Sequence, residues 1–121
     1  MKIQKLTEAE ENLTKLVWEN EPIKSSGLVK LCEKEFDWKK STTYTLLKRI
    51  EEKNILINND SIVTSLISEE DYYSETGHAF VRENFGGSLP RFLTAFTRKT
   101  KLSKEEIYEL QKLIDEHKEE E

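Results

Sequence analysis

Residues 38–50 read WKKSTTYTLLKRI, and this stretch decides the fold that we expect for the chain. It contains four basic residues and no acidic residue, although the whole chain has a net charge of −5. At the helical period of 3.6 residues, one face collects Thr43, Leu46, Leu47 and Ile50. The other faces collect lysines, hydroxyl groups and an aromatic ring. The pattern predicts an amphipathic helix with a basic, hydroxyl-rich outer surface.

Such an outer surface suits DNA, because the major groove admits one α-helix and exposes base edges to it. We therefore interpret residues 38–50 as the recognition helix of a helix-turn-helix. The candidate DNA-binding residues are Lys39, Lys40, Ser41, Thr42, Tyr44, Thr45, Lys48 and Arg49. Lys39, Lys40 and Arg49 are expected to contact phosphates, and the hydroxyl and aromatic groups to contact bases. This segment alone leaves open an ordinary helix with a solvated basic face.

Two further helices are predicted ahead of this segment. The capping box Thr7-x-x-Glu10 starts a first helix over residues 7–19, and the Ser-Ser-Gly of residues 25–27 opens a second. Three helices with short connections, the last basic on its outer face, form a helix-turn-helix. Cys32, the only cysteine, lies on the apolar face of the second helix. We expect it to be buried as a small hydrophobic residue in a reducing compartment.

Two β-rich runs follow the predicted recognition helix. Residues 55–57 and 62–67 flank an Asn-Asn-Asp-Ser turn at residues 58–61, and this pattern predicts a hairpin. A hairpin directly after a recognition helix is a wing, which a merely solvated basic helix would not predict. We therefore expect a mainly α protein whose residues 1–67 form a winged helix-turn-helix domain, with three helices and a short β-hairpin wing.

Residues 68–121 predict three more helices, of which the last is opened by a second capping box, Ser103-x-x-Glu106. They carry more large apolar residues than so few turns can bury among themselves. We therefore expect this region to form a homodimer. The candidate dimerisation residues are Tyr72, Phe80, Phe85, Leu89, Phe92, Leu93, Phe96, Ile107, Leu110 and Ile114. The alternative is that these helices fold back on the winged helix of the same chain.

Charge and composition exclude several classes of protein. Residues 1–53 hold 11 Lys and Arg against 10 Asp and Glu, whereas residues 54–121 hold 8 against 14. This asymmetry fits a DNA-facing front half, or a mixed surface with an acidic tail. No signal peptide and no apolar run of about 20 residues is present, so we expect a cytoplasmic protein without membrane insertion. His78 and His117 lack neighbours at metal-ligand spacing, and we predict no enzyme, catalytic residue, metal or cofactor.

The order of elements and several motifs resemble the BlaI/MecI family of penicillinase repressors. The matching segments are LTEAE at 6–10, VW at 17–18, WKKST at 38–42, YTLLKR at 44–49, SEEDY at 68–72, GGS at 86–88 and LS-x-EEI at 102–107. Together they span nearly the whole chain. The resemblance implies a dimeric winged-helix repressor that binds an inverted-repeat operator on double-stranded DNA and controls β-lactam-resistance or related genes.

The resemblance also implies a partner and a way in which repression ends. Members are often paired with a membrane sensor metalloprotease that acts indirectly and leads to cleavage in the short C-terminal helix. Ala95 and Phe96 stand at the corresponding bond in this chain. The turn at residues 58–61 lacks the basic residues that many members place in the wing. Two other classes stay open, a winged-helix protein-interaction module without a DNA role and a ligand- or metal-responsive repressor.

Overall fold

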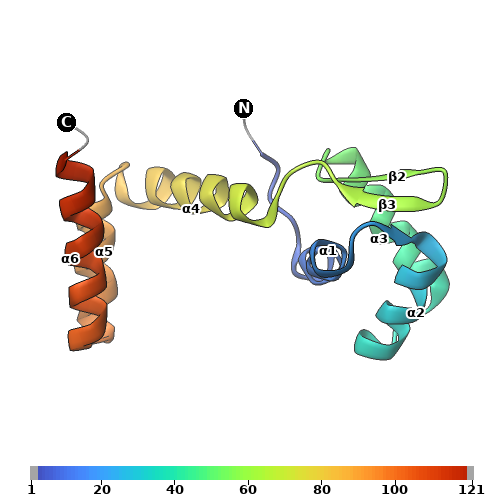
Figure 1. The fold of residues 1–121 in the computed structure, drawn as a ribbon, viewed down its shortest axis with the longest axis horizontal. Coiled ribbons are helices and arrows are strands. Elements are labelled where there is room, and N and C mark those ends of the chain that lie inside the picture. Colours follow the sequence, from blue (N-terminus) through green and yellow to red (C-terminus); the bar gives the residue numbers. More distant parts are fainter. Residues whose placement is uncertain (1–2, 120–121) are drawn as a thin grey trace. The chain divides into compact units, whose positions relative to one another are not determined.

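The computed structural model describes residues 3–119 and divides into two units, one that ends at Ala79 and one that begins at Phe80. Figure 1 shows the helices and strands of both units. In chain order they are α1 (Glu8–Asn20), β1 (Ile23–Lys24), α2 (Ser25–Phe36), α3 (Lys40–Glu52), β2 (Leu56–Asn59), β3 (Ile62–Ser65), α4 (Glu69–Phe85), α5 (Leu89–Lys99) and α6 (Lys104–Glu119). The expected fold class, a mainly α winged helix-turn-helix followed by C-terminal helices, is confirmed.

The start of α1 is held by the predicted capping box. The Thr7 hydroxyl accepts a hydrogen bond from the Glu10 backbone N–H, and the Glu10 carboxylate accepts one from the Thr7 backbone N–H. Two of the helix's otherwise unsatisfied N-terminal donors are thus bonded. Leu6, just before the cap, is buried in the core of the first unit.

The core of the first unit lies between α1, α2, α3 and the sheet. Its fully buried members come from all of these elements and are Leu13, Val17, Leu28, Cys32, Ile50, Ile55, Leu56 and Val63. Asp37 ends α2 in the left-handed conformation, with a φ of 59°, and allows the short turn into α3. The predicted burial of Cys32 is confirmed, and burial raises the pKa of its thiol.

The sheet has three antiparallel strands in the order β1-β3-β2, one strand more than the sequence predicted. Strand β1 escaped prediction because two residues are too few to show an alternating pattern. The hairpin turn is also tighter than expected, since Asn58 and Asn59 belong to β2. Asp60 and Ser61 form the turn with φ values of 53° and 66°, as a type I′ hairpin turn requires.

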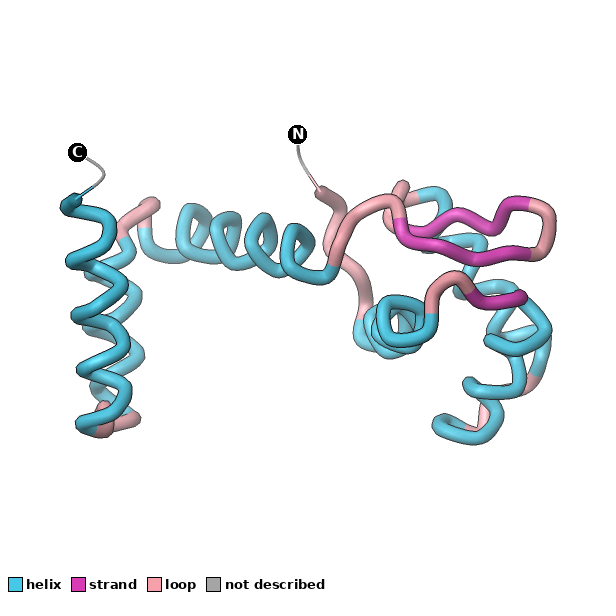
Figure 2. The backbone as a smooth tube through the Cα atoms, in the orientation of Figure 1, coloured by secondary structure: helices cyan, strands magenta, loops and turns pink. Residues whose placement is uncertain are grey.

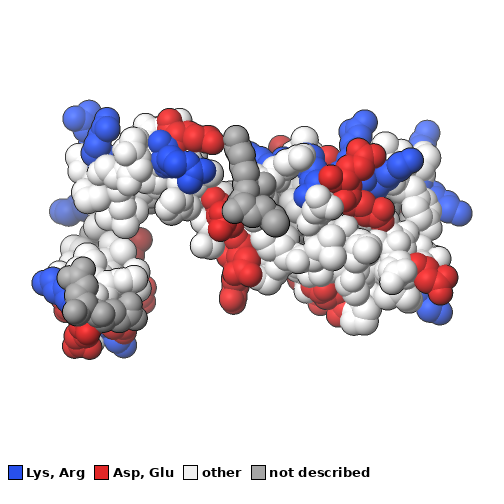
Figure 3. Space-filling model, turned by 90° about the horizontal axis from the view of Figure 1, so that it is seen from above, with Lys and Arg blue, Asp and Glu red and all other residues white. Residues whose placement is uncertain are grey.

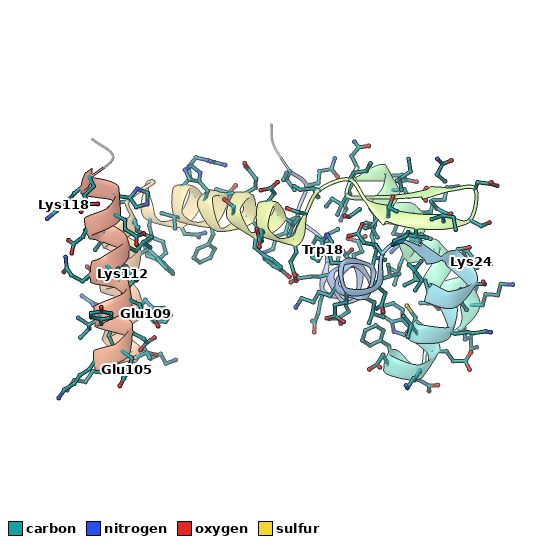
Figure 4. The ribbon with its side chains drawn as sticks, viewed as in Figure 1. Trp18, Lys24, Glu105, Glu109, Lys112 and Lys118 are labelled. Carbon is teal, nitrogen blue, oxygen red and sulfur yellow. The ribbon has the colours of Figure 1, made fainter. Side chains whose placement is uncertain are left out.

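Three hydrogen bonds that use aromatic side chains fix the start of α4 and the residue pair before it to α1 and to Leu6 just ahead of α1. The buried Tyr72 hydroxyl accepts from the Leu6 N–H at 2.9 Å, and the Tyr73 hydroxyl donates to Glu11 at 2.5 Å. The indole N–H of Trp18, which Figure 4 labels on α1, donates to the Ile67 carbonyl at 3.0 Å. The Trp18 ring lies 5.7 Å from that of Tyr72. The beginning of α4 is therefore part of the winged-helix core.

The second unit consists of the end of α4 and the pair α5 and α6, which run side by side (Figure 2). Gly86 and Gly87, with φ values of 60° and 78°, end α4. Ser88 caps α5, and the predicted Ser103–Glu106 capping box opens α6 with both of its hydrogen bonds formed. None of the described helices has the length and apolar content that a membrane-spanning segment needs.

Candidate nucleic-acid interface

Helix α3 presents the two faces that its sequence predicted. Thr43, Leu46, Leu47 and Ile50 are buried, so the apolar underside is packed on α1 and α2. Most side chains on the other faces are exposed. The exposed candidate residues are Lys40, Ser41, Thr42, Thr45, Lys48 and Arg49 of α3 and Lys39 just before it, whereas Tyr44 and Glu51 are half-buried.

The ammonium and guanidinium groups of α3 are available to a partner of opposite charge. The two salt bridges found within residues 3–119, Lys15–Glu11 and Lys53–Glu10, use none of them. Acidic and basic side chains interleave on the face of the molecule in Figure 3, so no large basic field covers it. The cations that could attract a phosphate backbone through α3 are Lys39, Lys40, Lys48 and Arg49.

A shallow groove of about 360 Å³ runs beside the exposed face of α3 and is open to solvent. The three hydroxyl residues that were predicted to contact bases all line it. The complete lining is Ala9, Trp38, Ser41, Thr42, Thr45, Leu46 and Arg49. The groove therefore leaves these three hydroxyl groups accessible beside α3.

Tyr44 has structural contacts that its sequence position did not reveal. Its hydroxyl donates to the Ser25 hydroxyl at 3.3 Å, which links α3 to the first residue of α2. The Lys40 ammonium lies 5.9 Å from the centre of the Tyr44 ring, within the range of a cation–π contact. Ser25 follows Lys24, which Figure 4 marks at the junction of β1 and α2. Tyr44 therefore contacts both α2 and Lys40, and it is not among the residues that line the groove.

The far end of α3 is tied to α1 by an ion pair. The Lys53 ammonium lies 2.5 Å from the Glu10 carboxylate and 3.1 Å from the Lys5 carbonyl. Burial acts to raise the pKa of Glu10, but hydrogen bonds from Lys53 and Thr7 and the Lys53 charge outweigh it, so the pKa is lowered. The sequence indicated only the capping role of Glu10, because Lys53 is 43 residues away. This pair links the C-terminal end of α3 to the first turn of α1.

The wing carries no Lys or Arg from residue 55 to residue 67. Its Asn58 backbone N–H donates to the Glu51 carboxylate at 2.8 Å, which attaches β2 to α3. Ile57, Ile62 and Leu66 are 39%, 37% and 54% exposed. The hairpin is therefore attached to α3 but offers no Lys or Arg of its own.

Helices α5 and α6 hold an exposed apolar surface. No described residue of either helix is buried, and Phe96, Ile107 and Ile114 remain about half exposed. Between the helices lies a groove of about 390 Å³. It is lined by Phe92, Leu93, Phe96, Leu102, Glu106, Glu109, Leu110 and Leu113.

The residues predicted for dimerisation fall into three groups. Phe80, Leu89, Phe96, Ile107 and Ile114 are exposed, whereas Phe85, Phe92, Leu93 and Leu110 are half-buried within the second unit. Tyr72 instead lies in the core of the first unit with 2% of its surface exposed. A buried side chain cannot contact another chain, and we leave Tyr72 out of the proposed dimer surface.

The remaining sites suggested by the sequence are also placed. Ala95 and Phe96, the possible cleavage position, lie inside α5 and are exposed. Among residues 3–119, no three His, Cys, Asp or Glu side chains are grouped so that they could hold a metal ion.

The fold and the exposed polar face of α3 define a protein of the winged helix-turn-helix class. A family model described as "Penicillinase repressor" matches residues 6–116, and the chain belongs to this family, which consists of transcriptional repressors and not of enzymes. The penicillinase repressor of Bacillus licheniformis is 30% identical over 121 residues, covering 97% of this chain and 94% of the relative. The methicillin resistance regulatory protein MecI of Staphylococcus aureus (strain N315) is 23% identical over 118 residues, covering 94% and 96%.

Proposed function

We propose that this protein is a homodimeric repressor that binds an inverted-repeat operator through α3. The observation that carries the proposal is the division of α3 into a buried apolar side and an exposed side of lysine and hydroxyl groups. Membership of a repressor family and the tied ends of α3 support it. A recognition helix must be rigid to hold several side chains in register with base edges.

Two kinds of contact are assigned to α3. Lys39, Lys40 and Arg49 neutralise phosphates, which supplies affinity without sequence information. Hydrogen-bonding side chains in and beside the groove, namely Ser41, Thr42, Thr45 and Lys48, contact base edges in the major groove. Tyr44 contributes through its contact with Lys40.

The exposed apolar surface of α5 and α6 supports dimerisation. Apolar side chains that stay about half exposed on two adjacent helices form the kind of patch that marks an interface. Two-fold symmetry also doubles the DNA sequence that is read and matches an inverted repeat. We assign residues 1–67 to DNA binding and residues 68–121 to dimerisation, with the first turns of α4 packed on the winged helix.

The names of the relatives suggest what is regulated. They are described as penicillinase repressors and as methicillin resistance regulators. We infer that this chain controls β-lactam-resistance or related genes and that a membrane sensor metalloprotease ends repression through cleavage near Ala95 and Phe96. The exposure of both residues in α5 is compatible with this, although a protease would first have to unwind the helix.

A protein-interaction module without a DNA role is the second candidate. The exposed Ile57, Ile62 and Leu66 and the absence of basic residues in the wing favour it. Such a module would show no preference between promoter DNA and a scrambled duplex.

Fluorescence anisotropy with labelled promoter fragments from the protein's own operon, at several salt concentrations, tests the proposal. We expect Lys40→Ala to weaken binding to every sequence and to reduce the salt slope by about 1, because one phosphate contact is lost. Lys30→Ala on the exposed side of α2 is the matched control and should bind like the parent.

Thr45→Ala in the same assay should instead relax discrimination at one half-site position, by roughly 1–3 kcal/mol. If Lys40→Ala and Thr45→Ala both bind the operator as tightly and as selectively as the parent, α3 is not the recognition helix. If the parent itself does not prefer promoter DNA over a scrambled duplex, the interaction-module function is the better one.

A further inference from the structure

Helix α4 contains a glycine, Gly77, where no steric requirement explains it. A Cβ atom added to Gly77 would meet no heavy atom within 4 Å. Its φ is not in the left-handed region that Gly86 and Gly87 occupy just after the helix. Glycine inside an exposed helix has more backbone freedom to lose than any other residue and therefore weakens the helix. The local effect of Gly77 is to loosen α4 near its middle.

Gly77 lies between the residues that attach α4 to the first unit and those that attach it to the second. On its N-terminal side, the Tyr73 hydroxyl donates to Glu11 of α1, and the Tyr72 hydroxyl accepts from Leu6 just before α1. On its C-terminal side, Phe80 contacts Phe92 of α5, with ring centres 6.0 Å apart. The division between the two units falls between these contacts, after Ala79. The two ends of α4 thus belong to different units, and the weakest helical residue lies between them.

We propose that Gly77 is a hinge in α4 and that it determines how wide a range of half-site spacings the repressor accepts. This inference rests on the proposed function, in which a dimer reads two half-sites. Each added base pair moves one half-site by about 3.4 Å and rotates it by about 34°. A rigid α4 would hold the two recognition helices at one spacing. If α4 bends at Gly77, each recognition helix can follow its half-site at a lower cost in free energy of distortion.

The hinge itself is tested without DNA by measuring a distance within one chain. Spin labels are attached to cysteines that replace Lys30 on α2 and Lys112 on α6, both of which are exposed (Figure 4 marks Lys112). The native Cys32 is buried and escapes labelling. Labelled chains are diluted in unlabelled protein, so that only pairs within one chain contribute. We expect Gly77→Ala to narrow the distribution of distances between the labels.

Ser74→Ala is the matched control for this measurement. Ser74 is exposed on the part of α4 that Tyr72 and Tyr73 already hold, and alanine also raises its helix propensity. We expect the distance distribution of Ser74→Ala to equal that of the parent. If Gly77→Ala leaves the width unchanged, or if Ser74→Ala narrows it equally, Gly77 is not a hinge.

The consequence for specificity is tested with operator duplexes in which the half-site spacing is changed by single base pairs. We expect Gly77→Ala to keep its affinity for the best spacing and to bind the neighbouring spacings about fivefold more weakly than the parent. A uniform loss at all spacings, or an unchanged profile, would overturn the link to spacing. If the parent binds no DNA at all, the proposed function fails, while the distance measurement still decides whether Gly77 is a hinge.

Discussion

At the scale of single residues, the orientation of the recognition helix depends on polar contacts beneath it. The Glu10 carboxylate accepts from the Thr7 N–H at the start of α1 and pairs with Lys53 at the end of α3. Glu10 itself is 2% exposed. Loss of one member of this pair destabilises the folded state, because the group that remains would keep its desolvation cost without its partner.

This contact predicts a specific dependence of stability on pH. The pKa of Glu10 is below its ordinary value of 4.5 in the folded protein, so its contribution is fully present above pH 4.5. The contribution is lost as the pH falls through the lowered folded-state pKa. We expect Glu10→Gln to reduce the free energy of unfolding at pH 7 by about 1–3 kcal/mol, and this difference to shrink in acid.

Urea denaturation at fixed protein concentration between pH 7 and pH 3 measures both effects. Glu8→Gln removes an exposed carboxylate from the same turn of α1 and should change stability little. A difference between Glu10→Gln and the parent that stays constant down to pH 3 would contradict the role of the ion pair.

At the scale of elements, the wing is a short hairpin whose turn is strained because Ser61 adopts a positive φ. Ser61 has a φ of 66°, a conformation that costs about 1–2 kcal/mol for a residue with a side chain. The Ser61 carbonyl also accepts from the Ser25 N–H at 2.9 Å, so the turn is attached to the start of α2. The hydrogen bond to Ser25 therefore depends on this backbone conformation of Ser61.

Replacement of Ser61 by glycine should relieve this strain. We expect Ser61→Gly to raise the free energy of unfolding by about 1 kcal/mol, since glycine adopts a positive φ without steric cost. The same change at Ser74, which lies in a helix, should lower it by roughly 0.5 kcal/mol. Thermal unfolding of the two variants provides the measurement, and shifts of equal sign would disprove the explanation.

At the scale of the whole molecule, the second unit depends on a partner chain in our proposal. On α6, Ile107 and Ile114 fall on the apolar stripe at helical spacing, whereas Tyr108, which is 71% exposed, falls on another side. A charge on the stripe would have to be desolvated in the dimer, but a charge at Tyr108 would stay in water.

The mass of the particle in solution distinguishes a charge placed on the apolar stripe from a charge placed at Tyr108. We expect the parent and Tyr108→Asp to scatter light as particles of twice 14.2 kDa, and Ile114→Asp to scatter as a single chain at micromolar concentration. The operator affinity of Ile114→Asp should fall with its dimerisation. A parent that remains monomeric would remove the dimer from the proposed function.

Much of the first unit could be predicted because its signals are local. The capping box at Thr7 and the buried positions of α3 follow from residues within a few turns of one another. The short strand β1 carries no pattern of its own and forms only because β3 lies beside it. Tyr72 is a large aromatic residue of the kind that occurs at dimer interfaces. Only its burial and its hydrogen bond to Leu6 in the folded chain show that it belongs to the core.

The sequence by itself determined the order of the helices, which side of α3 is polar, and that the C-terminal helices carry an apolar stripe. Its helix bounds were close but not exact, since the recognition helix predicted over residues 38–50 is α3 at Lys40–Glu52. These properties depend on propensity, capping and periodicity, which act over a few residues. The tertiary structure alone decided that Lys53 pairs with Glu10, that Tyr44 supports Lys40, and that α4 is held on α1 up to Tyr73. Most of these contacts join residues far apart in the chain, and all depend on side-chain geometry that only the packed chain defines.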